Sequence, residues 1–127
     1  MSAFSDYLEN KVLDHVFGGN AYSAPGTLYL ALYTSDPGDD NSGTECSGTA
    51  YARQTIAFTV TADTASNTSA VEFPTAGSAW GTITHVGILD ALTSGNLLAH
   101  GALTASKTVA QGDVFRVPAA DLDITLA

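Results

Sequence analysis

Residues 27–34 read Thr-Leu-Tyr-Leu-Ala-Leu-Tyr-Thr, and this stretch decides the expected fold. Its leucines fall on one side of an extended chain, and Tyr29, Ala31 and Tyr33 fall on the other. A period of two residues is that of a β-strand, because successive side chains point to opposite faces. The segment therefore predicts a strand with one aliphatic face and one partly aromatic face.

Similar strand signals recur along the rest of the chain, between polar segments rich in turn-forming residues. Residues 80–90 form the most apolar example, and a tight turn at residues 93–96 precedes a returning segment, which predicts a hairpin. Further strands are expected at residues 52–60, 71–73, 97–103, 107–109, 114–117 and 122–126, with polar loops at residues 35–48 and 61–69. About eight strands at this spacing predict a mainly β fold, an antiparallel β-sandwich resembling a jelly roll.

In the segment before these strands, apolar residues recur every four residues instead of every two. That period predicts one N-terminal amphipathic helix, whose apolar stripe consists of Phe4, Leu8, Val12 and Val16. A helix this short is marginally stable alone, so its stripe must dock on other protein. Two arrangements remain open: the stripe covers a face of the chain's own sandwich, or it packs on a neighbouring subunit.

Capping residues indicate where this helix begins and ends. Ser2 or Ser5 can cap its start, because a serine oxygen accepts a free N–H of the first turn. Gly18-Gly19 ends it, since glycine adopts the left-handed C-terminal conformation without strain. We therefore expect residues 1–19 to form a helical arm and residues 20–127 to form one β-sandwich domain.

Composition argues against several classes of function. The 127 residues include 4 basic and 13 acidic side chains, for a formal net charge of −9 at pH 7. Nucleic acids and anionic membranes are bound by an excess of Lys and Arg, so neither partner is expected. No secretion signal is visible, and the single Cys46 cannot form an internal disulfide, so we expect synthesis in a reducing compartment.

Residues that could carry catalysis occur without the partners that they would need. His85 and His100 lie on strands expected to pair, but no third ligand or acid is spaced to join them. Cys46 lies in a polar loop without a basic neighbour that would activate its thiol. We expect no enzymatic activity, no catalytic residue and no cofactor.

The polar loop at residues 35–48 is the best candidate for a metal site. It offers oxygen ligands of the kind that calcium prefers, from Asp36, Asp39, Asp40, Asn41 and Glu45. Their spacing differs from that of an EF-hand loop, and Asp-Pro-Gly-Asp is typical of a turn. The favoured interpretation is a solvated loop without a bound metal.

Arg53 and Arg116 are notable because basic residues are so few. Each lies in an expected strand, where an arginine can hold a carboxylate through two hydrogen bonds. The partner is either internal, such as Glu72 or Asp121, or acidic surface on another subunit.

Several segments resemble, in order, a family of small tailed-bacteriophage virion proteins whose members are often labelled tail fibre proteins. The segments are MSAFSDYLENKVLDHVFGG (1–19), TLYLALYTSDP (27–37), YARQ (51–54), EFP (72–74), WGTITHVGI (80–88), GNLL (95–98), HG (100–101) and GD (112–113). The resemblance covers nearly the whole chain. It implies a structural protein, made in the host bacterial cytoplasm and present in many copies in the virion.

The chain is also similar in character to capsid cement or decoration proteins. We expect it to stabilise the shell by adhesion, as a dimer or trimer bound to the major capsid protein or to a tail protein. The expected interface residues are Phe4, Leu8, Val12, Val16, Tyr29, Tyr33, Arg53 and Arg116.

The alternative is a tail or tail-fibre component, or an adhesin module that binds a host glycan. Tyr29, Tyr33 and Trp80 would then form a stacking surface, with calcium held beside it in the acidic loop.

Overall fold

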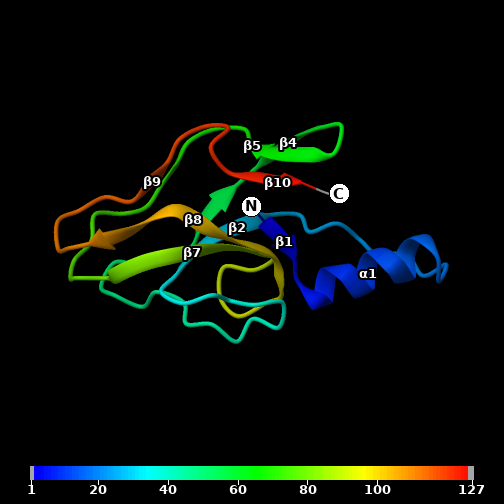
Figure 1. Ribbon diagram of the computed structural model, residues 1–127, viewed down its shortest axis with the longest axis horizontal. Helices are drawn as coiled ribbons and strands as arrows, with labels where there is room; N and C mark the ends of the chain where they lie inside the picture. Colours follow the sequence, from blue (N-terminus) through cyan, green and yellow to red (C-terminus); the bar gives the residue numbers. More distant parts are fainter. Residues whose placement is uncertain (1, 126–127) are drawn as a thin grey trace.

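The computed structural model describes residues 2–125, which form ten strands and one helix (Figure 1). In chain order these are β1 (Ser2–Phe4), α1 (Asp6–Val16), β2 (Leu28–Tyr33), β3 (Gln54–Ile56), β4 (Phe58–Thr61), β5 (Thr64–Asn67), β6 (Val71–Glu72), β7 (Gly81–Leu89), β8 (Leu97–Val109), β9 (Arg116–Val117) and β10 (Asp123–Thr125). The expected mainly β class with one N-terminal helix is confirmed. No helix in this range is long and apolar enough to cross a membrane.

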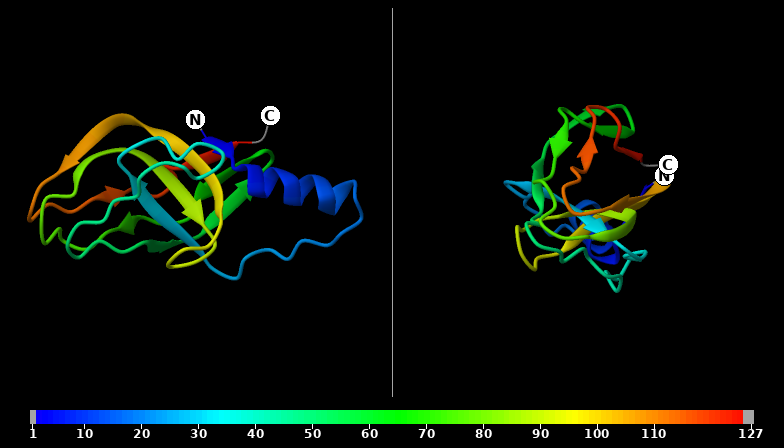
Figure 2. Two further views of the ribbon diagram at one scale, coloured as in Figure 1. Left: turned by 90° about the horizontal axis from the view of Figure 1, so that it is seen from below. Right: turned by 90° about the vertical axis from the view of Figure 1, so that its left-hand side faces the viewer.

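The strands form three antiparallel sheets. The largest has the order β1-β8-β7-β2-β3, the second has the order β10-β5-β4, and β6 pairs with β9 in the third. Viewed end-on in Figure 2, the sheets curve around a shared interior, and β1 lies beside β10. The first two sheets therefore approach each other along β1 and β10.

The main hydrophobic core lies on the concave face of the five-stranded sheet. Leu30 and Leu32 of β2 point into it, as their alternation predicts. Aromatic rings fill its far side: Tyr51 stacks on Phe73 with 6.1 Å between ring centroids, and Phe115 meets Phe73 edge-on at 5.9 Å. On the opposite face of the sheet, Ala31, Tyr33, Leu89 and Leu97 form a second, smaller cluster. Strand β2 is therefore buried on both faces.

Three strand predictions need correction. The strand expected at residues 52–60 is two strands, β3 and β4, separated at Ala57. Residues 64–67, expected to be loop, form β5, which pairs with β4 through a turn at Ala62-Asp63 in which Ala62 has a φ of 54°. Strand β5 has no apolar alternation and is held by its pairing with β4 and β10. Strand β8 runs continuously over both segments expected at residues 97–109.

The helix begins later than its apolar period indicates. Ser5 is the N-cap, which confirms one of the two expected caps, and α1 ends just before Gly18-Gly19. Phe4 is therefore not part of a helical stripe; it lies in β1, opposite Ala99 of β8. Leu126, assigned to the last strand, lies outside the described residues, and the division into arm and sandwich stays a prediction.

A cavity-creating substitution tests this core. We expect Ile83→Ala, at a fully buried position of β7, to lower the free energy of unfolding by about 2–4 kcal/mol. Urea denaturation measures the loss. Val60→Ala, at an exposed position of β4, is the control and should change stability by less than about 0.5 kcal/mol. Equal effects of the two substitutions would contradict the assignment of the core.

Candidate functional site

The start of α1 is fixed to the sheet by the buried residue Ser5. Its N–H donates to the Leu98 carbonyl at 2.8 Å, and its hydroxyl donates to the Leu97 carbonyl. The same hydroxyl oxygen accepts the Leu8 N–H at 3.2 Å, which caps the helix. One more bond, from the Asp6 N–H to the Asp39 carbonyl at 2.9 Å, joins the first turn to the acidic loop. These bonds set the direction in which the helix leaves the body.

One side of the helix is covered by the chain itself. The return segment, residues 18–27, runs back from the helix end toward β2 (Figure 2). In this segment the Tyr22 N–H donates to His15 Nδ1 at 3.0 Å, and the Tyr22 ring meets Tyr7 edge-on with 6.4 Å between centroids. Asn20 Nδ2 donates to Asp14 at 2.9 Å. The helix and its return segment thus form one projecting unit.

The outer part of this unit carries an exposed apolar surface. None of residues 6–16 is buried. The tip patch consists of four side chains with these exposed fractions: Val12 38%, Leu13 57%, Val16 61% and Phe17 82%. Exposure is greatest at the end farthest from the sheet. Of the two arrangements left open, packing on the chain's own sandwich is therefore wrong for Val12 and Val16, whereas packing on a neighbouring subunit stays a prediction. Leu8 is half-buried.

Sequence periodicity identified two members of the tip patch and missed the other two. Leu13 and Phe17 are also four residues apart, and this second i, i+4 pair was the available signal. The interface roles of Leu8, Val12 and Val16 stay predictions.

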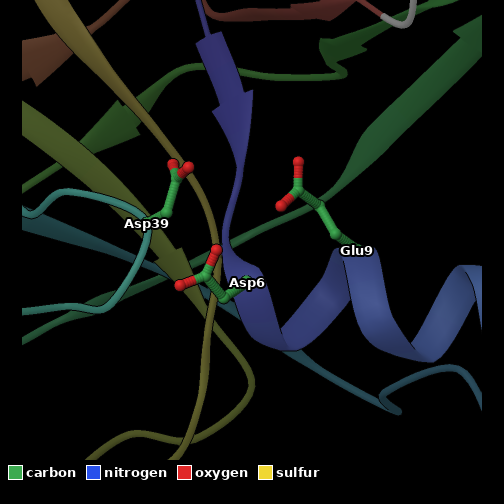
Figure 3. Close-up of side chains that lie close together, drawn as sticks. All are labelled: Asp6, Glu9 and Asp39. Carbon is green, nitrogen blue, oxygen red and sulfur yellow. The ribbon is translucent and has the colours of Figure 1, made fainter.

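Close to the start of the helix, three carboxylates converge. Asp6 and Glu9 of the first turn face Asp39 of the acidic loop, with one oxygen of each within 4.8 Å of the others (Figure 3). All three are exposed, and His100 Nε2 lies 2.8 Å from Asp39 Oδ1. Exposed acidic groups close to a helix N-terminus also interact favourably with its positive end. The cluster is chemically able to hold a divalent cation, but its geometry is equally that of a solvated helix start.

The loop ligands expected for calcium are not brought together. Asp36 accepts the Gly38 N–H at 2.9 Å and Asp40 accepts the Ser42 N–H at 3.2 Å, so both shape turns. Asn41 accepts the Tyr33 hydroxyl at 2.9 Å. Of the five predicted loop ligands, the described carboxylate cluster contains Asp39 alone.

Arg53 has an internal partner, but it is Glu45 rather than Glu72 or Asp121. Nε and Nη2 donate to the two Glu45 oxygens at 2.9 and 2.8 Å. Nη1 donates to the carbonyls of Ala91 and Ser94, each at 2.8 Å. With 9% of its side chain exposed, Arg53 ties the acidic loop to the turn after β7 and offers little surface to a partner.

The same network shifts the pKa of Glu45. Burial alone would raise this pKa, but hydrogen bonds from Arg53 and Tyr51 outweigh burial and hold it below the ordinary value of 4.5. The Tyr51 hydroxyl donates to Glu45 at 2.6 Å, and burial together with this bond raises the pKa of Tyr51. Glu45 is therefore ionised at neutral pH.

The aromatic residues predicted to bind a glycan do not form a surface. Tyr33 is buried, and burial raises its pKa to about 12. Trp80 is buried as well and donates from Nε1 to the Thr49 carbonyl at 2.9 Å. Tyr29 is half-buried. The predicted stacking surface is wrong, because two of its three rings fill the interior.

The remaining candidates are dispersed. Arg116 is exposed on β9, directly opposite Glu72 in the strand register. His85 Nδ1 lies 2.8 Å from the Thr84 hydroxyl, whereas His100 contacts Asp39, so the two histidines have different partners. Cys46 is buried, and burial raises the pKa of its thiol, which disfavours the reactive thiolate.

A groove that sequence reasoning missed lies between β8 and the C-terminal segment. Its cavity has a volume of about 340 Å³. It exists because small residues of β8 stand opposite large ones of β7: Ala99 pairs with Ile88 and Gly101 with Val86. The β8 groove, as we call it, is lined on its apolar walls by Val86, Ile88, Ala99, Gly101 and Leu103 on one side and by Phe115, Val117, Leu122 and Ile124 on the other.

Two features give this groove a defined shape. In β8, residues 103–106 stand opposite the single residue Thr84 of β7, a large bulge that bends the rim outward. The other wall is held by the buried Asn67, whose side chain donates to the Pro118 carbonyl at 2.8 Å and accepts the Leu122 N–H at 2.9 Å. Asn67 therefore fixes the C-terminal wall, whereas the bulge interrupts the regular pairing of the β8 wall.

The first prediction from this geometry concerns Ser5. We expect Ser5→Ala to destabilise the protein by about 2 kcal/mol, because the cap and a buried hydroxyl bond are lost together. Hydrogen exchange should become faster in the first turn of α1. Ser23→Ala, in the exposed part of the return segment, is the matched control. Unchanged exchange in α1 would show that Ser5 does not anchor the helix.

The second prediction from this geometry concerns Glu45. We expect Glu45→Gln to lower the free energy of unfolding by about 2 kcal/mol at pH 7, because Arg53 loses its counter-charge. A lowered native pKa stabilises the fold above the unfolded pKa, and this contribution is lost as pH falls through the native value. The difference between wild type and variant should therefore shrink below pH 4.5.

Urea unfolding at several pH values measures this difference, with Glu72→Gln as the exposed control. A difference that stays constant down to pH 3 would refute a lowered pKa for Glu45.

Comparison with known proteins agrees with a structural role. No curated protein matches the chain. A family model described as podophage GP4 fiber I protein gp80 matches residues 3–125, which is nearly the whole chain. That description also fits the resemblance to phage proteins labelled as tail fibres. The chain belongs to the podophage GP4 fiber I protein gp80 family, and so is a structural component of the virion.

Proposed function

We propose that this chain is a non-enzymatic structural subunit of a phage tail fibre and that it is held there by its tip patch. The single observation that carries the attachment is the exposure of Leu13, Val16 and Phe17 on a helix that projects from the sheets. An apolar surface of this kind is typical of a contact with another protein. The family favours the tail-fibre alternative over the capsid cement that we expected first.

The energy available from this surface is sufficient for assembly. Burying the four side chains of the tip patch would contribute about 5–8 kcal/mol by area, before the cost of ordering is subtracted. Contacts of this size are weak singly, but many copies in a symmetric particle act together. Attachment then needs no catalytic group, which agrees with the scattered positions of His85, His100 and Cys46.

Incorporation into the phage particle tests this proposal. We expect Phe17→Ser to reduce the amount of this protein in purified virions at least several-fold, because the most exposed apolar ring of the tip patch is removed. Quantitative mass spectrometry, normalised to the major capsid protein, measures its copy number. Val60→Ser removes an exposed apolar side chain from β4, outside the tip patch and 71% exposed, and should leave copy number unchanged.

Immunogold electron microscopy on the same particles locates the protein. Label on the tail fibres supports the proposal. Label spread over the capsid shell would contradict it and restore the cement function, and an unchanged copy number for Phe17→Ser would exclude the tip patch as the attachment surface.

A further inference from the structure

We propose that the tip patch of one copy docks into the β8 groove of a second copy, so that subunits associate head to tail. This rests on the proposed function in taking the tip patch as a contact surface, and it names the partner. The two surfaces have matching chemistry: the tip patch presents aliphatic side chains and one phenyl ring, and the groove walls are formed largely by aliphatic and aromatic side chains. A cavity of about 340 Å³ is large enough to accept an aromatic ring with neighbouring aliphatic groups.

The helix cannot fill its own groove. Ser5 fixes the base of α1 beside β1, and the helix projects away from β9 and the bulged part of β8 (Figure 2). The return segment, bonded to His15 and Asp14, holds the tip in that direction. Part of the groove wall is buried in the chain's own core, but Leu103, Leu122 and Ile124 are only half-buried. Because the tip patch cannot reach them on its own chain, the two surfaces can meet only between chains.

Charge opposes contact less at the β8 groove than over the chain as a whole. Copies that each carry a net charge of −9 repel one another. Lys107 and Arg116, two of the four basic residues in the sequence, line this groove. The helix that carries the tip patch is acidic, with Asp6, Glu9 and Asp14 against Lys11. Asp121 and Asp123 line the groove as well, so its basic and acidic residues balance, and an acidic helix meets less repulsion there than a chain of net charge −9 offers on average.

A second hollow is less suitable. It lies beside β3 and β4 and is lined by Pro25, Leu28, Ile56 and Phe58 among others, but by no charged residue. It has apolar surface without the basic groups that would attract an acidic helix. The addition of a foreign β-strand to β8 is also disfavoured, because the bulge at residues 103–106 breaks the regular edge that such a strand would need.

The proposed contact has a consequence for symmetry. Because two different surfaces meet, the interface is heterologous, and repeated copies form either a closed ring or an open chain. A ring would supply a homo-oligomer suited to a fibre, with every tip patch and every groove occupied.

Two single variants and a control test the contact. Phe17→Ser removes the ring from the tip patch, and Ala105→Trp places a bulky group at the groove from an exposed position. Val60→Ser, outside both surfaces, is the matched control. Circular dichroism first checks that each full-length variant is folded, and sedimentation velocity at several concentrations then measures association. Wild type and Val60→Ser should form the same oligomer, and each surface variant should dissociate at about tenfold higher concentration or more.

Mixing the two surface variants gives the decisive result. The Phe17→Ser chain keeps an intact groove and the Ala105→Trp chain keeps an intact tip patch, so the mixture should form dimers containing one chain of each. A mixture that stays monomeric would overturn the inference, because the intact groove of one chain would then fail to bind the intact tip patch of the other. Wild type that is monomeric at about 100 μM would overturn it as well.

The outcomes separate this inference from the proposed function. A protein that is monomeric in solution, but whose incorporation into fibres depends on Phe17, would leave the function standing and refute a second copy as the partner. If mixing restores dimers but immunogold labelling places the protein on the capsid, the head-to-tail contact stands and the tail-fibre function is refuted.

Discussion

The arrangement of this protein depends on the hydrogen bonds of one small buried residue, Ser5. Its backbone and hydroxyl bond to the carbonyls of Leu98 and Leu97, and the same hydroxyl oxygen caps the helix by accepting from Leu8. A strand that pairs with β8 therefore turns into a helix whose direction is set at its first residue. Because the return segment adds bonds along the helix rather than to the sheet, the tip patch is held away from the core and stays exposed.

The sheets bury their own core without help from this helix. The leucines of β2 and the rings of Tyr51, Phe73 and Phe115 fill the interior, and Arg53 ties the acidic loop to the turn after β7. Apolar groups left outside such a core cost solubility, and so a protein that keeps them has a use for them. The chemistry of the chain supports the same view: Asp36 and Asp40 shape turns, Glu45 holds Arg53, and the only described thiol is buried.

Local sequence patterns predicted part of this structure. The alternation around Leu30, the Ser5 cap and the Gly18-Gly19 stop each act over a few residues, so each could be read directly. Strand β5 could not, because residues 64–67 have no apolar face and are held by pairing with β4 and β10. Phe4 fits the helical period equally well, and only β8, distant in sequence, assigns it to a strand. The groove likewise depends on Asn67 holding residues more than fifty positions away.

The central claim is that the tip patch is buried by another chain when the protein is assembled. Oxidative footprinting measures this directly, by comparing side-chain modification in the intact virion with that in the dilute isolated protein. The account predicts that Phe17 is protected several-fold in the virion. Leu92, an exposed leucine in the turn after β7, should be modified to a more similar extent in the virion and in the isolated protein. Equal modification of Phe17 in the two states would contradict it.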